Sequence, residues 1–234
     1  FCYSGCTMKT TCTLFFLTLF LINGITPPSA QAQAAATKVI MIDPAGHAKQ
    51  TGRKLRQGYE RAETYAFASA LKTALEQRMP LLRVVLTRTP GTAIVPLQNA
   101  SFANRLPADL FIQLSFYKET AEKPTVSIYH LVFDPILDNA KREPNPIGFI
   151  PIHQAHYTSL AETKNITQTF KTTLSSTQTT HGFTCLDVYG LPIKALVGIT
   201  APAITIECGL LEDKQWQQLV DPLVESIQKT FIIL

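Results

Sequence analysis

The feature that most constrains the fold is the alternation of short apolar runs with segments of helical periodicity. Lys38–Ile42 is an apolar run typical of a strand buried on both faces, and a turn follows at Asp43–Gly46. Glu60–Arg78 places apolar residues at the spacing of one helix face and ends before Pro80. Such strand–helix units predict a mainly parallel sheet covered by helices.

The same pattern continues along the chain and predicts one α/β domain, with an open sheet and helices on both faces. Further strands are expected at Leu82–Thr87, Leu110–Leu114, Thr125–Phe133, Leu191–Val197 and Ala203–Ile206. Further helices are expected after Pro96, at Tyr157–Leu174 and at Asp213–Phe231. The proline-rich stretch Asp134–Pro151 is predicted to be a surface excursion. A hydrophobic content of 46% with 16% charged residues fits a globular chain.

The N-terminal segment has the pattern of a secretory leader. It has a basic start at Lys9, an apolar core at Leu14–Ile25 and a small-residue motif at Ala30–Ala32. We expect cleavage after Ala32 or Ala34. The apolar core is shorter than the roughly 20 residues of a membrane span, so no stable span is expected once the leader is removed. An uncleaved anchor is the alternative.

This leader defines the expected organisation and location of the protein. Residues 1–34 form the leader, residues 1–7 before Met8 are interpreted as a start-site artefact, and residues 35–234 form the single domain. The domain is expected in the periplasm or outside the cell. Of the cysteines, only Cys185 and Cys208 follow the leader, and they can pair or remain free thiols.

The charge distribution excludes one class of partner. The net charge of +4 is mild and spread along the chain, without the basic run or basic-aromatic interleaving of a nucleic-acid-binding protein. A pI near 8.8 is compatible with an anionic partner such as cell wall. We therefore expect no nucleic-acid partner.

Polar residues follow several of the predicted strands. His47 lies in the loop after the first strand, Ser115 follows the third strand, and Glu207 follows the apolar run 203–206. In an open α/β sheet, ligands bind outside the carboxyl ends of the strands. Glu60 projects from the apolar face of its helix and suits either a metal ligand or a helix-start carboxylate, and Glu63 shares that face. These residues are the candidates for the site.

The segments that carry these residues resemble the zinc-dependent N-acetylmuramoyl-L-alanine amidases. Lys38–His47 resembles the first-strand motif, in which Asp-x-Gly-His supplies a zinc ligand, and Gly58–Glu60 resembles the segment of the glutamate ligand. Pro202–Gly209 is similar to the segment with the catalytic glutamate. Val84–Arg88 and Ala103–Ile112 are similar to the segments between. The resemblance runs from about Lys38 to the C-terminus.

This resemblance implies an amidase-like fold and a chemistry. Zn²⁺ is the implied cofactor, with His47 and Glu60 as metal ligands and Glu207 as the catalytic residue. Zinc would polarise the lactyl amide carbonyl and activate a water, and Glu207 would pass the proton of that water to the leaving amine. The implied substrate is peptidoglycan, cleaved between muramic acid and L-alanine, and the expected state is a monomer.

The chain departs from the family pattern at the metal site. Ser115 stands where the family has a second histidine ligand, and Ala45 looks inserted before Gly46 and His47. A catalytic zinc ion has three protein ligands and one open position, so His47 and Glu60 alone would hold it weakly. Four histidines are candidates for the missing ligand, with none preferred: His130, His153, His156 and His181.

Two alternatives to a zinc amidase follow from these departures. One is a catalytically inactive pseudo-amidase that binds peptidoglycan or regulates an active amidase. The other is an enzyme that hydrolyses a different amide, because a fold does not fix the substrate.

Overall fold

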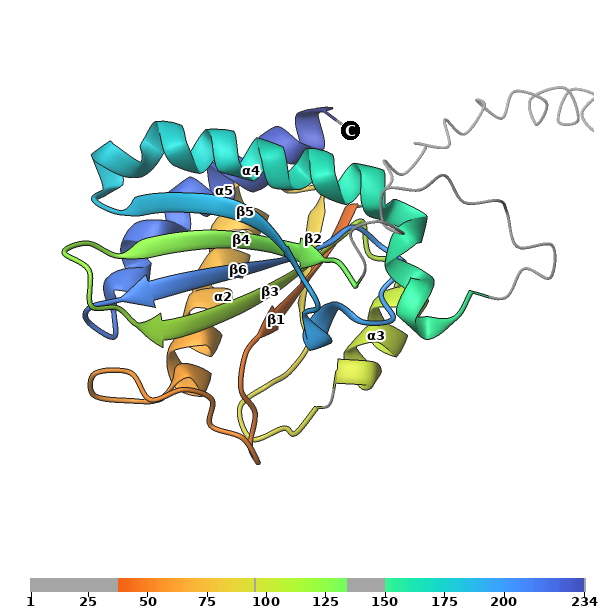
Figure 1. Ribbon diagram of the computed structural model, residues 1–234, viewed down its shortest axis with the longest axis horizontal. Helices are drawn as coiled ribbons and strands as arrows, with labels where there is room; N and C mark the ends of the chain where they lie inside the picture. Colours follow the sequence, from red (N-terminus) through yellow and green to blue (C-terminus); the bar gives the residue numbers. More distant parts are fainter. Residues whose placement is uncertain (1–37, 95, 134–149, 234) are drawn as a thin grey trace, which may run out of the picture. The chain divides into compact units, whose positions relative to one another are not determined.

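The computed structural model describes residues 38–94, 96–133 and 150–233. The predicted leader and nearly all of the excursion at 134–151 lie outside these residues. The described part contains a six-stranded sheet with the strand order β2-β1-β3-β6-β4-β5 (Figure 1). The strands are β1 (Lys38–Pro44), β2 (Leu82–Leu86), β3 (Leu110–Lys118), β4 (Thr125–Leu131), β5 (Thr184–Leu191) and β6 (Ala203–Leu210).

The sheet is mostly parallel. Strands β2, β1, β3 and β6 run in one direction, β4 is antiparallel to β6, and β5 is parallel to β4. The α/β class and the mainly parallel sheet predicted from the sequence are confirmed. The carboxyl ends of β1, β3 and β6, three neighbouring strands, meet at one edge of the sheet.

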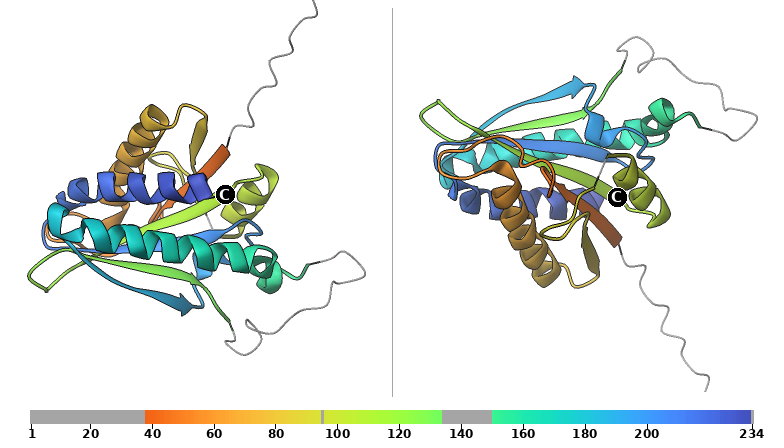
Figure 2. Two further views of the ribbon diagram at one scale, coloured as in Figure 1. Left: turned by 90° about the horizontal axis from the view of Figure 1, so that it is seen from above. Right: turned by 90° about the horizontal axis from the view of Figure 1, so that it is seen from below.

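Helices cover the two faces of the sheet unequally. Helices α2 (Glu60–Arg78), α5 (Val220–Ile233) and α4 (Leu160–His181) lie side by side on one face (Figure 2). They pack on the main core, to which β1 contributes Ile40 and Ile42. On the other face, α3 (Pro96–Arg105) and the short 3₁₀ helix η3 (Lys194–Leu196) form a smaller cluster.

Alternation along the strands places polar side chains on the sparsely covered face, next to the part that α3 and η3 cover. Asp43 is in register with Gln113, Gln113 with Thr205, and Ser115 with Glu207. Their sequence neighbours lie in the main core under the three helices. Because side chains in a strand alternate between faces, this polar set shares one face of the sheet. We call this surface the open face.

The structure corrects one predicted strand, shifts two helices and lengthens two strands. Strands β3 and β6 run past Ser115 and Glu207, which were expected directly after them. The strand expected at Leu191–Val197 is wrong: β5 ends at Leu191 and η3 follows. β5 is an edge strand with mostly exposed residues, so its sequence lacks an apolar run. The apolar stretch that was taken for a strand includes Leu196, which packs in the smaller cluster instead. The helix expected from Tyr157 starts at Leu160 after the 3₁₀ helix η2 (Ile152–Ser159), and the last helix starts at Val220 after η4 (Gln215–Leu219).

The two cysteines of the domain are free thiols. Cys185 of β5 and Cys208 of β6 are both in register with Val126 of β4, on opposite sides of that strand. Two strand spacings separate them by roughly 9–10 Å, beyond the reach of a disulfide. Among the described helices, none is long and apolar enough to cross a membrane.

Candidate functional site

Glu207 lies on the open face, where β6 brings it beside Ser115 of β3 and Ser127 of β4. Its side chain is 23% exposed. The Tyr129 hydroxyl donates a hydrogen bond to Oε2 at 2.9 Å, and Nη1 of Arg53 donates to Oε1 at 2.7 Å. Both carboxylate oxygens are therefore fixed in direction while the group remains reachable from solvent.

Glu60, at the start of α2, is only 4% exposed. Its carboxylate accepts hydrogen bonds from the backbone amides of Phe116 at 2.8 Å and Arg53 at 2.9 Å. The bond from Phe116 ties the helix start to β3 one residue after Ser115. The neighbouring candidate Glu63 points elsewhere and accepts a hydrogen bond from the Trp216 indole at 2.7 Å. Of the two glutamates, Glu60 is the one at the strand ends.

Arg53 joins the two carboxylates. Its guanidinium makes ion pairs with Glu60 (Nη2 to Oε1, 3.1 Å) and Glu207 (Nη1 to Oε1, 2.7 Å). Burial opposes the charged form, but the hydrogen bonds to Glu60 and Glu207 outweigh it and raise the pKa of Arg53. The guanidinium also lies over the Tyr117 ring at 5.7 Å. Arg53 was not among the predicted site residues, because no local sequence pattern distinguishes it from other surface arginines.

The loop before α2 holds Arg53 in this position. Gly52 has a φ of +75°, and a Cβ there would lie 2.7 Å from the Glu60 carboxylate, so the turn requires glycine. The Arg53 carbonyl accepts a hydrogen bond from the Glu60 amide at 2.8 Å. Further along the loop, the Asp213 carboxylate accepts hydrogen bonds from the backbone amides of Arg56 and Gly58, at 2.9 and 2.6 Å.

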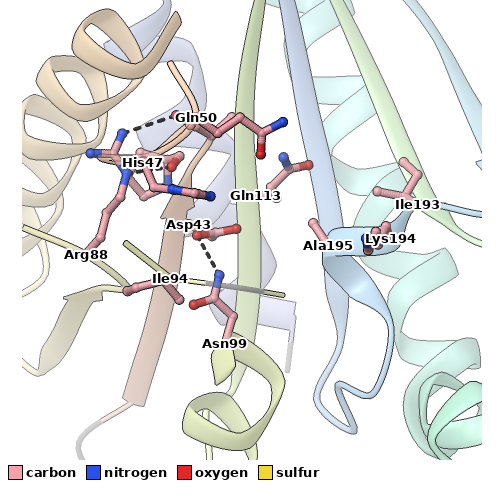
Figure 3. A pocket seen from close by; sticks show the side chains of 13 residues that line it. Asp43, His47, Gln50, Arg88, Ile94, Asn99, Gln113, Ile193, Lys194 and Ala195 are labelled. Atoms are coloured by element: carbon pink, nitrogen blue, oxygen red, sulfur yellow. Dashed lines mark hydrogen bonds between the residues drawn. The ribbon is translucent and has the colours of Figure 1, made fainter. Parts of the chain in front are cut away.

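His47 lies in the loop after β1, where its carbonyl accepts a hydrogen bond from Arg61 of α2 at 3.4 Å. Its backbone pairs with Gln50 in a short turn, and its ring nitrogen Nδ1 accepts the Lys49 amide at 3.2 Å. The ring lines a cavity of about 340 Å³ together with Asp43, Asn99 and Gln113 (Figure 3). Glu60 and Glu207 are not part of its lining.

Two buried polar side chains, Asp43 and Asn99, line the cavity beside His47. Asp43 Oδ1 accepts hydrogen bonds from Thr87 Oγ1 at 2.6 Å and Asn99 Nδ2 at 2.8 Å. Burial, partly offset by these bonds and by the charge of Arg88, raises the pKa of Asp43 to about 6. Asn99 Oδ1 is buried without a hydrogen-bond partner among the described residues.

The four histidines weighed as replacement ligands do not complete a metal site. His130 is in register with Ile204, a residue of the main core, so it points to the helix-covered face and away from Glu207. His156 stacks on Tyr157 in η2, with ring centroids 4.0 Å apart. Across residues 38–94, 96–133 and 150–233, no three His, Cys, Asp or Glu side chains form a group that could hold a metal ion.

The family model for N-acetylmuramoyl-L-alanine amidases matches residues 40–223, most of the chain. The chain belongs to the N-acetylmuramoyl-L-alanine amidase family. This membership confirms the resemblance and the predicted class of function, a hydrolase of cell-wall amide bonds. No curated protein matches the chain closely enough to count as a relative.

Solved amidase structures share the fold. The catalytic domain of the amidase CwlV from Paenibacillus polymyxa aligns with a TM-score of 0.62 at 18% identity, over 84% of this chain and 99% of that one. An amidase from Clostridium difficile 630 aligns with a TM-score of 0.60 at 19% identity, over 84% and 98% of the two chains. AmiC2 of Nostoc punctiforme aligns with a TM-score of 0.62 at 14% identity, over 84% and 98%.

The site of this amidase-family chain does not fit a catalytic zinc ion. Zinc needs three protein ligands and an open position, and the described residues offer no such group. His47 faces the cavity with Asp43, Ser115 supplies only a hydroxyl, and Glu60 is fully engaged by Arg53 and two backbone amides. The predicted zinc ligands His47 and Glu60 therefore stay predictions that this geometry does not support.

Proposed function

We propose that this amidase-family chain binds peptidoglycan along the open face and cleaves the amide between muramic acid and L-alanine beside Glu207. The position of Glu207 supports this most directly. It lies in the carboxyl-terminal half of β6, partly exposed, with one oxygen held by Tyr129 and the other by Arg53. Ligands of open α/β sheets bind outside the carboxyl ends of the strands.

The residues of the chain suggest a division of roles. Glu207 would accept a proton from the attacking water and return it to the departing alanine amine. Arg53 has five N–H groups, and its contacts with Glu60 and Glu207 use three of them. The other two could donate to the amide oxygen, where negative charge develops during attack. Tyr129 would keep Glu207 in position.

Features on either side of Glu207 suit the two parts of the proposed substrate. The rings of Tyr129 and Tyr189 lie 5.5 Å apart, and Tyr189 is 42% exposed, which offers an aromatic surface for a sugar ring. The cavity lined by Asp43, Asn99 and His47 offers a polar space for a stem peptide. We infer that the glycan lies over the tyrosines and the peptide enters the cavity.

The proposed substrate sets where the protein acts. Peptidoglycan lies in the cell envelope, so we propose that residues 1–34 export the domain 35–234 to the periplasm or the cell surface, where it acts as a monomer. N-terminal sequencing of the exported protein tests the leader, with a mature start directly after Ala32 or Ala34 expected. A mature chain that retains residues 1–34 would contradict it.

Digestion of purified peptidoglycan tests the activity. Soluble muropeptides are incubated with the protein and separated by chromatography and mass spectrometry. We expect free stem peptides that begin with L-alanine, together with glycan whose muramic acid carries no peptide. Glu207→Gln keeps the shape of the side chain and should release neither product. Intact muropeptides, under conditions in which another amidase cleaves them, would contradict hydrolysis.

A second candidate function is binding of peptidoglycan without hydrolysis. The observation that favours it is the pairing of Glu207 with Arg53, which engages the carboxylate that would act as base. Sedimentation with intact sacculi distinguishes the two functions. A pure binding protein would sediment with the sacculi and release no peptide. Its Glu207→Gln variant would bind the sacculi as well as the wild type does.

A further inference from the structure

We propose that Arg53 is the resident cation of this site and takes the place of the metal ion that the family resemblance implies. The proposal concerns the occupancy of the site and rests on the proposed function only for the identity of the substrate. It is carried by the guanidinium that joins Glu60 and Glu207, the two carboxylates assigned by resemblance to metal binding and catalysis.

The charges of the site are already compensated. Glu60 is almost fully buried, and a buried carboxylate requires a positive partner or strong donors. Arg53 supplies both through Nη2 at 3.1 Å and its backbone amide at 2.9 Å. An arginine stays protonated at any physiological pH, so this positive charge is permanent. A divalent cation at the same carboxylates would be repelled by the guanidinium.

Arg53 is held by its own backbone, so it is a built part of the site. Its amide donates to Glu60, its carbonyl accepts from the Glu60 amide, and Gly52 makes the turn that permits both contacts. The loop is fixed at a second point by Asp213. Truncating the Arg53 side chain would therefore remove the guanidinium contacts, while the backbone contacts still hold the loop beside the site.

The presence of Arg53 also explains Ser115. Ser115 is 6% exposed and lies in register with Glu207, one residue before the amide that binds Glu60. With a guanidinium between the carboxylates, a histidine at this position would have no metal to bind. A small neutral hydroxyl leaves room for the arginine. The replaced histidine and the bridging arginine thus form one consistent arrangement.

Arg53 can also contact the ligand directly. The N–H groups of Arg53 that face neither carboxylate are available to a carbonyl or carboxylate oxygen of the ligand. Recognition at this site therefore depends on Arg53 and is independent of zinc. A chelator that removes zinc should leave ligand affinity unchanged.

The first arm of the test is metal content. The full chain is equilibrated with excess zinc, desalted and analysed for bound metal, as wild type, Arg56→Ala and the double variant Arg53→Ala/Ser115→His. Arg56 is a matched control because it lies in the same loop and pairs with the exposed Glu212. We expect no stoichiometric zinc in wild type or Arg56→Ala, and a gain of zinc in the double variant.

Two results in this arm would count against the proposal. Stoichiometric zinc in wild type, lost on His47→Ala, would overturn it, because the metal would then coexist with Arg53. A double variant that folds, as judged by circular dichroism, yet gains no zinc would show that Arg53 and Ser115 are not what excludes the metal.

The second arm measures affinity for a soluble muropeptide by calorimetry, with and without a chelator. Wild type should bind equally in both conditions, and Arg53→Ala should bind about tenfold or more weakly, because hydrogen bonds to charged groups are lost. Arg53→Lys should recover part of the affinity. Loss of wild-type binding on chelation would overturn the proposal. Absence of muropeptide binding in every variant would sink the proposed function instead, since the metal analysis decides the role of Arg53 by itself.

Discussion

The two faces of the sheet differ in what determines them. On the helix-covered face, consecutive inward residues of β1, β3 and β6 are apolar and pack under α2, α4 and α5. On the open face, the alternate residues of the same strands are polar, and a loop from outside the sheet delivers Arg53 to them. Local periodicity determines the first face, whereas contacts between distant segments determine the second. Substitutions on the two faces should therefore fail in different ways.

The largest loss of stability is expected on the covered face. Phe67 is fully buried and lies against Phe116 and Trp216, with ring centroids 5.5 and 5.6 Å away. Phe67→Ala should lower the free energy of unfolding by about 3–5 kcal/mol, because it removes a large side chain and leaves a cavity. Chemical denaturation measures the loss. Leu81→Ala, at a position that is 62% exposed, is the control and should change stability by less than about 0.5 kcal/mol. Equal losses of unfolding free energy in the two variants would contradict the role of Phe67 in the core.

A smaller loss is expected at the junction of the open face. Arg53→Ala leaves the buried Glu60 with only its two backbone donors. Breaking a buried pair costs about 3–5 kcal/mol, but the Arg53 side chain is 44% exposed, so we expect roughly 1–3 kcal/mol. Glu60→Gln should lower stability by less in the Arg53→Ala background than in wild type, because the charge that it removes is then uncompensated. A double-mutant cycle that gives no coupling would contradict the bridge.

Asp43 should make the open face sensitive to pH. Burial raises its pKa from the usual 3.8 to about 6, so the folded state favours the protonated form. Its contribution to stability is complete below about pH 4 and is lost as the pH rises through about 6. Asp43→Asn should therefore be more stable than wild type at pH 7, by roughly 1–3 kcal/mol, and should match it near pH 4. Denaturation curves across this range measure the difference, and a constant offset would argue against the assignment.

The smallest effect on stability, with the largest on activity, is expected at Glu207. Glu207→Gln keeps acceptor and shape on a partly exposed group, so stability should change by less than about 1 kcal/mol. Release of stem peptide should fall to background, because an amide cannot serve as the base. Tyr129→Phe provides the graded comparison, since it removes one hydrogen bond to Glu207 and should reduce activity only in part. A Glu207→Gln variant that retains activity would remove Glu207 from the reaction.

The sequence predicted the covered face well. The α2 helix matched its expected bounds because its apolar stripe, its acidic first turn and the following proline are all local signals. The strand β5 was missed because an edge strand with exposed residues shows no apolar run. Glu60 lies in the first turn of α2 as expected, whereas Glu207, expected just after a strand, lies within β6, which continues to Leu210.

The contact that defines the site could not be predicted in the same way. Arg53 and Glu207 are 154 residues apart in sequence, and their meeting depends on the strand order and on the loop held by Gly52 and Asp213. The placement of His47 in the neighbouring cavity likewise depends on the turn that its backbone forms with Gln50. Ser115 indicated a departure from the family's metal-site pattern, but no sequence pattern pointed to Arg53.

Native mass spectrometry of the intact wild-type chain tests whether Arg53 stands in the place of a metal ion. The folded protein is sprayed from a zinc-containing volatile buffer and again after treatment with a chelator. We expect the same mass in both spectra, because Arg53 already occupies the place of the cation. A mass higher by one zinc ion per chain, removed by the chelator and absent in His47→Ala, would contradict it.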